Sequence, residues 1–171
     1  FEYAYLDPIT KKGNIYYFRK KGQEKLDKEK HKENQYLLVL DINKFKMINK
    51  AYGYKTGDTI LNGIAEELEK NLGEQSIICR YSNDYFAVLF EYAEDIRKLI
   101  SALVKNIENL KINSNVYNLS VNMGIYKLTD ADTNISVAMD KAIIAHSASK
   151  GDVFDKFHIY DEKMEKELEK E

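Results

Sequence analysis

The stretch QYLLVLDIN, residues 35–43, limits the folds open to this chain more than any other segment. Its apolar residues lack the alternation of a strand that faces water on one side, so the pattern indicates a strand buried on both faces. The run ends at a single acid, Asp41. Such a strand needs helices packed against its sheet, and chemistry in these folds is carried at strand ends and turns. We therefore expect a layered fold with a functional position near Asp41.

The remaining segments supply the other elements of such a fold. Helical spacing of apolar residues predicts helices over residues 15–30, 56–72, 93–110 and 134–149, with a short helix directly after Asp41. Strands are predicted over residues 77–81, 85–91, 116–126 and 157–161. This order predicts an α+β fold, a ferredoxin-like mixed central sheet with flanking helices.

Length and composition restrict the class of protein. A chain of 171 residues is long enough for one domain with a core. Its 26 basic and 28 acidic residues give a net charge of −2, which argues against a dedicated nucleic-acid binder. The single cysteine, Cys79, rules out an intramolecular disulfide and fits a reducing compartment. No apolar run approaches the ~18–20 residues that span a bilayer, so we expect a cytoplasmic domain with no membrane segment.

The two ends of the chain suggest a part of something longer. The sequence begins abruptly at Phe1 and ends in the charged pattern DEKMEKELEKE, which is typical of a solvated helix. We expect one domain over residues 1–160 and a helical tail over residues 161–171 that starts a linker to a following domain. A larger, membrane-anchored protein would also be compatible with this arrangement.

Two acids are candidate metal ligands. Asp41 closes the first buried strand, and Asp84 lies at the tip of a hairpin over residues 77–91. Neighbouring strands in a ferredoxin-like sheet would bring both carboxylates to one divalent cation, for which Mg²⁺ is the natural choice. The same residues are also explained by a strand-end cap at Asp41 and an ordinary turn aspartate at Asp84.

The segment after Asp41 favours a nucleotide ligand. Amides at the start of the short helix, together with Lys46, could bind phosphates, while Asn49 and Asp58 could hydrogen-bond a base edge. An EF-hand does not fit, because the glycine and the closing glutamate are missing. The chain contains neither a P-loop nor a dinucleotide-binding glycine motif.

Together these segments resemble the GGDEF domain, the diguanylate cyclase family, whose fold is related to nucleotide cyclases and the polymerase palm. DPIT…N (7–14) is similar to its opening D-x-L-T-x-x-x-N, and LDINKFKMINKAYGYKTGDTIL (40–61) follows its D-x-D-x-F-K-x-x-N-D-x-x-G-H-x-x-G-D-x-x-L. RYSNDYF (80–86) stands where R-x-G-G-D/E-E-F is expected, LSVNMGIY (119–126) resembles the S-x-G strand, and AMDKAIIAHSASKGD (138–152) resembles the last helix.

The resemblance implies a reaction and a set of roles. Two GTP molecules, one on each subunit of a head-to-head homodimer, would condense into cyclic di-GMP. The implied roles are metal binding by Asp41, Asp84 and the Ile42 backbone carbonyl, guanine binding by Asn49 and Asp58, and triphosphate binding by Lys46 with the backbone near Phe45.

The chain departs from the family pattern at its signature turn, Ser82, Asn83, Asp84, Tyr85 and Phe86. Ser82 and Asn83 replace glycines that let the backbone approach the nucleotide, although Asn83 can adopt the left-handed conformation. Tyr85 replaces a glutamate, and a phenol cannot serve as a Mg²⁺ ligand or a base near pH 7. No residue is therefore assigned as catalytic.

The family's phosphate-binding cations are also altered. Its lysine and arginine align with Ser147 and Gly151, and Lys150 would substitute only after a shift of register. The product-inhibition motif R-x-x-D falls on GEQS, residues 73–76, without either charged end.

We therefore predict a catalytically impaired GGDEF domain that acts as a GTP-binding or dimerising regulatory module in cyclic di-GMP signalling, with Mg²⁺ bound together with GTP. The tail resembles the helix that joins degenerate GGDEF domains to a C-terminal EAL domain, so that domain is an expected partner. Two alternatives stay open. One is an active diguanylate cyclase, a nucleotidyltransferase, with a divergent signature; the other is a structural interaction module without a nucleotide site.

Overall fold

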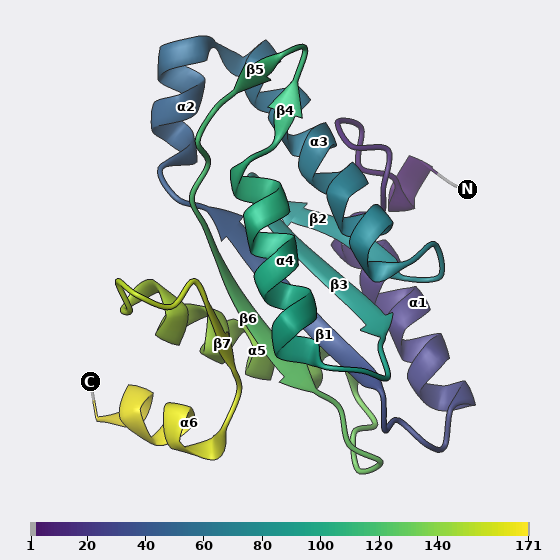
Figure 1. Cartoon of the computed structure of the whole chain (residues 1–171). Coiled ribbons are helices and arrows are strands. Elements are labelled where there is room, and N and C mark those ends of the chain that lie inside the picture. Colours follow the sequence, from purple (N-terminus) through teal and green to yellow (C-terminus); the bar gives the residue numbers. More distant parts are fainter. Residues whose placement is uncertain (1–2, 171) are drawn as a thin grey trace.

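A computed structural model describes residues 3–170 of the chain. Within this range, five strands form the main sheet in the order β2-β3-β1-β6-β7 (Figure 1). The strands are β1 Gln35–Ile42, β2 Ile77–Ser82, β3 Tyr85–Glu91, β6 Val121–Lys127 and β7 Phe157–Ile159. All neighbours pair antiparallel except β6 and β7, which are parallel. The predicted mixed sheet is thus confirmed, with β1 at its centre.

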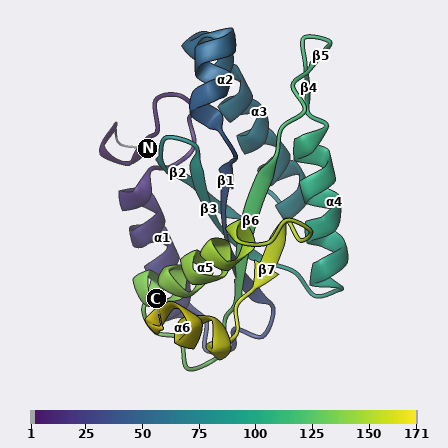
Figure 2. The ribbon, with the colours of Figure 1, turned by 90° about the vertical axis from the view of Figure 1, so that its left-hand side faces the viewer.

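Helices cover both faces of this sheet. They are η1 Tyr3–Tyr5, α1 Ile15–Lys28, α2 Phe45–Tyr52, α3 Tyr54–Leu72, α4 Ile96–Glu108, α5 Ile135–Lys150 and α6 Glu162–Glu169. Figure 2 shows α1 and α5 on one face and α3 and α4 on the other. The fold class is as predicted, an α+β fold with a mixed central sheet and flanking helices.

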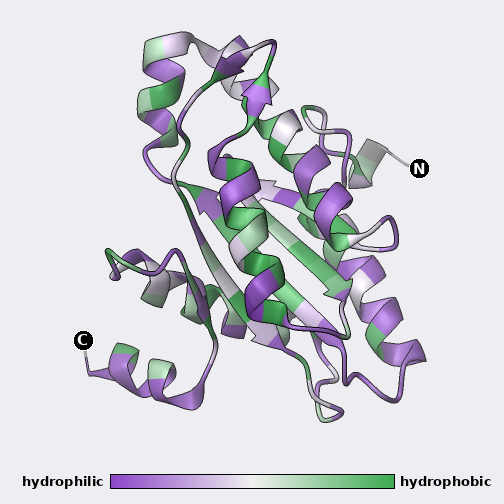
Figure 3. Ribbon diagram, in the orientation of Figure 1, coloured by the Kyte–Doolittle hydropathy of each residue, from purple (hydrophilic) through white to green (hydrophobic). Residues whose placement is uncertain are grey.

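The central strand is buried on both faces, as its sequence predicted. Every residue of β1 is buried. Leu38 and Leu40 join the core under α3 and α4, whereas Leu37 and Val39 join the core under α1 and α5. Figure 3 accordingly shows hydrophobic colour along the central strands and mostly hydrophilic colour on α6. The uninterrupted apolar run is therefore required by a sheet sandwiched between two layers of helices.

The strand predicted over residues 116–126 is wrong in its first half. Residues 117–120 form an irregular connection, and Asn118 has a φ of 52°. The residues before it form a small hairpin of β4 Lys111–Ile112 and β5 Asn115–Val116, whose turn has two residues with positive φ. Strands of two residues are too short to produce a recognisable hydrophobic alternation, so this hairpin was not predicted.

One glycine sets how closely α5 approaches the sheet. A Cβ atom on Gly124 of β6 would lie 2.1 Å from the backbone nitrogen of His146 and 2.2 Å from the backbone oxygen of Ala142. Only a residue without a side chain allows this contact, because such distances are far below ordinary carbon contacts. The close approach places the C-terminal half of α5 beside the end of β1, where Asp41 lies.

The helices can also be compared with the length of a membrane span. Among the helices of residues 3–170, none is both long enough and apolar enough to cross a bilayer.

Candidate functional site

Asp41 is held by two side chains from one helix. Its side chain is buried, with 3% of the residue exposed. Oδ1 lies 2.8 Å from Nε2 of His146, and Oδ2 lies 2.5 Å from Nζ of Lys150. The two partners are four residues apart on α5 and therefore face the same side of that helix. Both carboxylate oxygens thus have nitrogen partners supplied by the protein.

These contacts determine the ionisation of Asp41. Burial by itself would raise the pKa of this carboxyl, but hydrogen bonds and charge interactions with His146 and Lys150 outweigh burial and hold the pKa below its usual value. For Lys150, burial would lower the pKa, but the bond to Asp41 dominates and raises it. Asp41 and Lys150 therefore form a stable ion pair at neutral pH.

Asp84 lies next to this ion pair. Strands β1 and β3 are neighbours, as expected. Asp84 lies in the turn that connects β2 to β3. Its Oδ2 accepts a hydrogen bond of 3.0 Å from the backbone N–H of Ile42. Burial raises the pKa of Asp84, and the charge of Asp41 raises it further, although the Ile42 N–H acts in the opposite direction. The two acids are therefore brought to the same end of the sheet.

Tyr85 packs over the same group. Its ring meets the His146 ring edge-on with centroids 5.8 Å apart, and Nζ of Lys150 lies 5.8 Å from the Tyr85 centroid. Tyr81 of β2 packs against its other side at 5.5 Å. The residue that replaces the expected glutamate therefore covers the partners of Asp41, and it makes a cation–π contact with Lys150.

The donor set around Asp41 does not fit a Mg²⁺ ion as it is arranged. Mg²⁺ requires several oxygen ligands in octahedral geometry at about 2.0–2.1 Å. The two Asp41 oxygens are paired with nitrogen groups, one Asp84 oxygen accepts from a backbone amide, and Tyr85 offers a phenol. Metal binding by Asp41, the Ile42 carbonyl and Asp84 stays a prediction drawn from the family pattern.

The signature turn contains no glycine and has one residue with positive φ. Asn83 adopts a φ of 45°, and the pairing of β2 with β3 is irregular between Arg80 and Ser82. Arg80 stabilises the turn by donating a hydrogen bond of 2.6 Å to the carbonyl oxygen of Asn83. The same guanidinium binds both carboxylate oxygens of Asp7, at 2.8 and 3.0 Å. The Arg80 guanidinium therefore links the turn to the N-terminal loop through the buried Asp7.

The first member of the predicted guanine-binding pair lies at the contact between α2 and α3. Asn49 on α2 packs against Gly57 of α3, where a Cβ atom would lie 1.8 Å from Asn49 Oδ1. Asp58 follows directly on α3. Within residues 3–170, its backbone oxygen accepts from Asn62, and its carboxylate has no hydrogen-bond or ion-pair partner. Asn49 thus contacts the residue that precedes Asp58, and the Asp58 carboxylate is free to accept bonds from a ligand.

The predicted phosphate-binding residues begin α2. Lys46 is exposed, and Phe45 is buried against α3. The residue before the helix, Lys44, has a φ of 58° and provides no side-chain cap. The Met47 amide bonds the Lys44 carbonyl oxygen, but no side chain caps the first turn of α2, where the helix dipole favours an anion.

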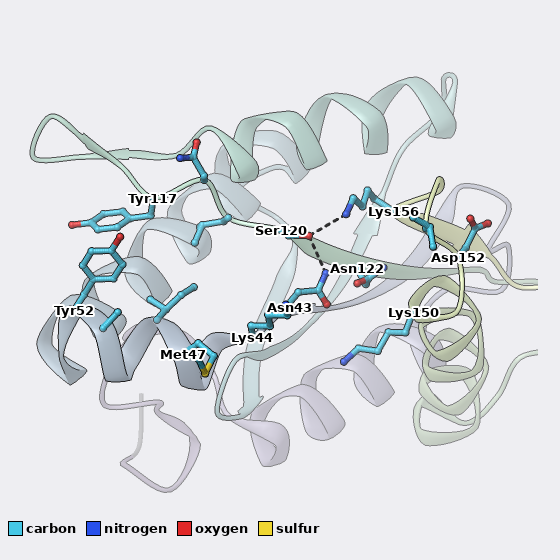
Figure 4. Close-up of a pocket in the computed structure, with 15 residues that line it drawn as sticks. Asn43, Lys44, Met47, Tyr52, Tyr117, Ser120, Asn122, Lys150, Asp152 and Lys156 are labelled. Carbon is cyan, nitrogen blue, oxygen red and sulfur yellow. Dashed lines mark hydrogen bonds between the residues drawn. The ribbon is translucent and has the colours of Figure 1, made fainter.

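A pocket of about 650 Å³ opens beside these elements (Figure 4). Its lining includes Lys44, Lys150 and Lys156 at one end and the packed rings of Tyr52 and Tyr117, 5.3 Å apart, at the other. Asn49, Asp58 and Asp84 are not among its lining residues. The pocket therefore does not coincide with the predicted guanine site, and it meets the Asp41 cluster only through Lys150.

Sequence reasoning missed His146 and assigned Lys150 to a different role. Lys150 was predicted as a replacement phosphate ligand, whereas the structure places its ammonium on Asp41. Ser147, which aligns with the family lysine, is exposed on α5. The spacing of four residues between His146 and Lys150 was the available signal, because it puts two nitrogen-bearing side chains on one helix face.

The family comparison and the curated relatives point to the same family. The description "Diguanylate cyclase, GGDEF domain" matches residues 4–155. The chain is 38% identical over 73 residues, 42% of its length, to the bifunctional diguanylate cyclase/cyclic di-GMP phosphodiesterase MucR of Pseudomonas aeruginosa. It is 34% identical over 87 residues, 50% of its length, to the diguanylate cyclase TpbB of the same species. These matches span 11% and 20% of the two relatives.

A solved structure shows the same fold. A diguanylate cyclase/phosphodiesterase from Caldicellulosiruptor saccharolyticus superposes with a TM-score of 0.80 at 20% identity, covering 91% of this chain and 93% of that one.

Proposed function

The chain belongs to the GGDEF domain family of diguanylate cyclases, and we propose that it is a catalytically impaired member that acts as a GTP-binding or dimerising regulatory module in cyclic di-GMP signalling. The observation that carries this proposal is the cluster at the end of β1. Tyr85 stands where the family has a glutamate, and Lys150 and His146 occupy the oxygens of Asp41. The carboxylates that would organise phosphoryl transfer are thereby reduced in number and already paired.

The expected loss of rate is large. Phosphoryl transfer depends on positioning and on charge stabilisation of the triphosphate. Loss of one electrostatic contact of this kind costs on the order of a hundredfold in rate. The glutamate and two phosphate-binding cations are replaced by Tyr85, Ser147 and Gly151. The product of three such losses would leave the condensation of GTP negligible, even with Mg²⁺ supplied together with the nucleotide.

Binding of GTP needs fewer groups than its condensation. Asn49 on α2 packs against Gly57, the residue before Asp58 on α3, and the Asp58 carboxylate has no partner within the described residues. The uncapped start of α2 and the exposed Lys46 add positive potential nearby. These features support retention of a guanine site in a domain that has lost its chemistry.

A direct assay tests the loss of catalysis. The purified chain is incubated with GTP and either Mg²⁺ or Mn²⁺, and cyclic di-GMP is quantified by chromatography and mass spectrometry. An active GGDEF domain at the same concentration serves as the positive control. We expect no product above background, and turnover comparable to the control would instead establish an active cyclase with a divergent signature.

Calorimetry with GTP tests the regulatory site. We expect binding by the wild-type chain that is weakened at least tenfold in Asp58→Asn and in Asn49→Ala. The charge-matched control is Glu66→Gln, an exposed position further along α3, which should bind GTP like the wild type. Absence of GTP binding in the wild type would favour the structural interaction module. Analytical ultracentrifugation with and without GTP measures the expected homodimer.

We further propose that residues 1–160 form the GGDEF domain and that residues 161–171 begin a linker to an EAL domain. Helix α6 packs against α5, and Met164 and Leu168 line the groove between them. MucR and the Caldicellulosiruptor protein combine cyclase and phosphodiesterase in their descriptions, which supports this arrangement. The test is the gene sequence beyond Glu171, where an EAL signature is expected and an unrelated sequence would overturn the proposal.

A further inference from the structure

The buried carboxylate of Asp41 requires a positive partner in any state of this domain. An ionised carboxylate that is removed from water without a partner costs several kcal/mol, so Asp41 must be neutralised by a metal ion or by the protein itself. The two partners from α5 meet this requirement. Nζ of Lys150 and Nε2 of His146 lie at 2.5 and 2.8 Å from different oxygens of the same carboxylate.

A divalent cation would compete with these groups for the same oxygens. A Mg²⁺ or Mn²⁺ ion bound at Asp41 would place two more positive charges directly beside the ammonium of Lys150. The cation–π contact with Tyr85 favours the present position of Lys150. A glutamate at position 85 would instead supply another metal ligand. Tyr85 and Lys150 therefore both disfavour a metal ion at Asp41.

We propose that Lys150, supported by His146 and Tyr85, is a built-in replacement for the divalent metal ion at Asp41, so that this carboxylate does not recruit Mg²⁺ or Mn²⁺. The Lys150 side chain is 42% exposed whereas the Asp41 side chain is 4% exposed. Lys150 thus lies between the buried acid and solvent, and a substitution can remove its ammonium group. Its removal should uncover a metal site formed by Asp41 and Asp84. This inference concerns the metal ion alone and holds whether or not the chain binds GTP.

The test is Mn²⁺ binding to the full chain without nucleotide. Binding is measured by electron paramagnetic resonance of the free ion and by calorimetry. We expect Lys150→Met to bind Mn²⁺ at least tenfold more tightly than the wild type. The matched control is Lys156→Met, because Lys156 lines the same pocket but donates to Ser120 Oγ at 3.0 Å and not to Asp41. This control should bind Mn²⁺ like the wild type.

A double variant assigns the gain to the carboxylate. Adding Asp41→Asn to Lys150→Met should return Mn²⁺ affinity to the wild-type level. The proposal is overturned if the wild type already binds Mn²⁺ as tightly as Lys150→Met in an Asp41-dependent manner, or if Lys150→Met shows no gain. Circular dichroism verifies that each variant is folded, and Lys150→Gln, which keeps a polar side chain, repeats the measurement should the methionine variant be unfolded.

Because no nucleotide is present, this experiment can fail while the GTP-binding proposal stands, and the reverse is also true. The two proposals are therefore distinguishable.

Discussion

Replacing Gly124 by alanine should destabilise the domain by about 3 kcal/mol, because it forces β6 and α5 apart. The added methyl group would lie 2.1 and 2.2 Å from two backbone atoms of α5. Backbone atoms cannot rotate away as a side chain can, so relief requires a shift of the whole helix by more than about 1 Å in a densely packed interior. Overpacking of this kind alone costs about 1–3 kcal/mol.

The shift of α5 also affects the site, and this adds a second destabilising contribution. His146 is on the contacted turn of α5, and its bond to Asp41 is 2.8 Å long. A displacement of about 1 Å stretches this bond beyond hydrogen-bonding distance and leaves a buried acid poorly satisfied, which costs about 1–3 kcal/mol more. The two ranges add to about 2–6 kcal/mol, and the expected value of about 3 kcal/mol, in the lower half of that sum, corresponds to a decrease in Tm of about 6–12 °C for a chain of this size.

Thermal and urea unfolding at pH 7, followed by circular dichroism, measure this effect. The matched control is Gly151→Ala at the end of α5, where φ is −80° and the nearest atom to an added Cβ lies at an ordinary 3.6 Å. The control should remain within about 0.5 kcal/mol of the wild type. If Gly124→Ala were equally neutral, the close approach of α5 would not be what positions His146, and the reasoning would be refuted.

Two further perturbations test the electrostatics of the site. The pKa of Asp41 is lowered by folding, so its stabilising contribution is present above the unfolded pKa and is lost as the pH falls through the lower folded value. The free energy of unfolding, measured by urea titration between pH 6 and 2, should therefore decrease less steeply with falling pH in Asp41→Asn than in the wild type. A steep acid loss that is unchanged in this variant would contradict the assignment. Arg80→Ala should cost about 3 kcal/mol in urea unfolding, because it breaks a buried ion pair with Asp7. Lys21→Ala, which breaks an exposed pair, should cost under about 1 kcal/mol, and equal effects would argue against a special role for Arg80.

Local patterns in the sequence were sufficient to predict most of the fold. The run in β1 predicted a strand buried on both faces, and the hairpin over residues 77–91 predicted the neighbour that carries Asp84. Boundaries were less accurate. Helix α3 begins at Tyr54, before the predicted Thr56, because Gly53 with a φ of 91° separates it from α2 within a single residue. Such a tight connection leaves no polar stretch for a sequence pattern to reveal.

The partners of Asp41 could not be predicted in the same way. His146 is 105 residues away along the chain, and it reaches the carboxylate only because Gly124 allows α5 to lie on β6. The sequence contains the glycine, the histidine and the lysine, but no periodicity links them to the first strand. Long-range ion pairs depend on the packing of elements, which hydrophobic spacing predicts only as a class of fold.

The position of Lys150 explains how the end of β1 remains stable with a tyrosine at position 85. If Asp41 had no partner on α5, the end of β1 would contain a buried carboxylate with neither a complete metal site nor a protein cation. Such a carboxylate would cost several kcal/mol. That amount is a large fraction of the about 5–15 kcal/mol by which domains are stable. An ammonium group on α5 removes the penalty without any ligand. We therefore infer that the ammonium of Lys150 both stabilises the end of β1 in this domain and opposes the binding of a metal ion at Asp41.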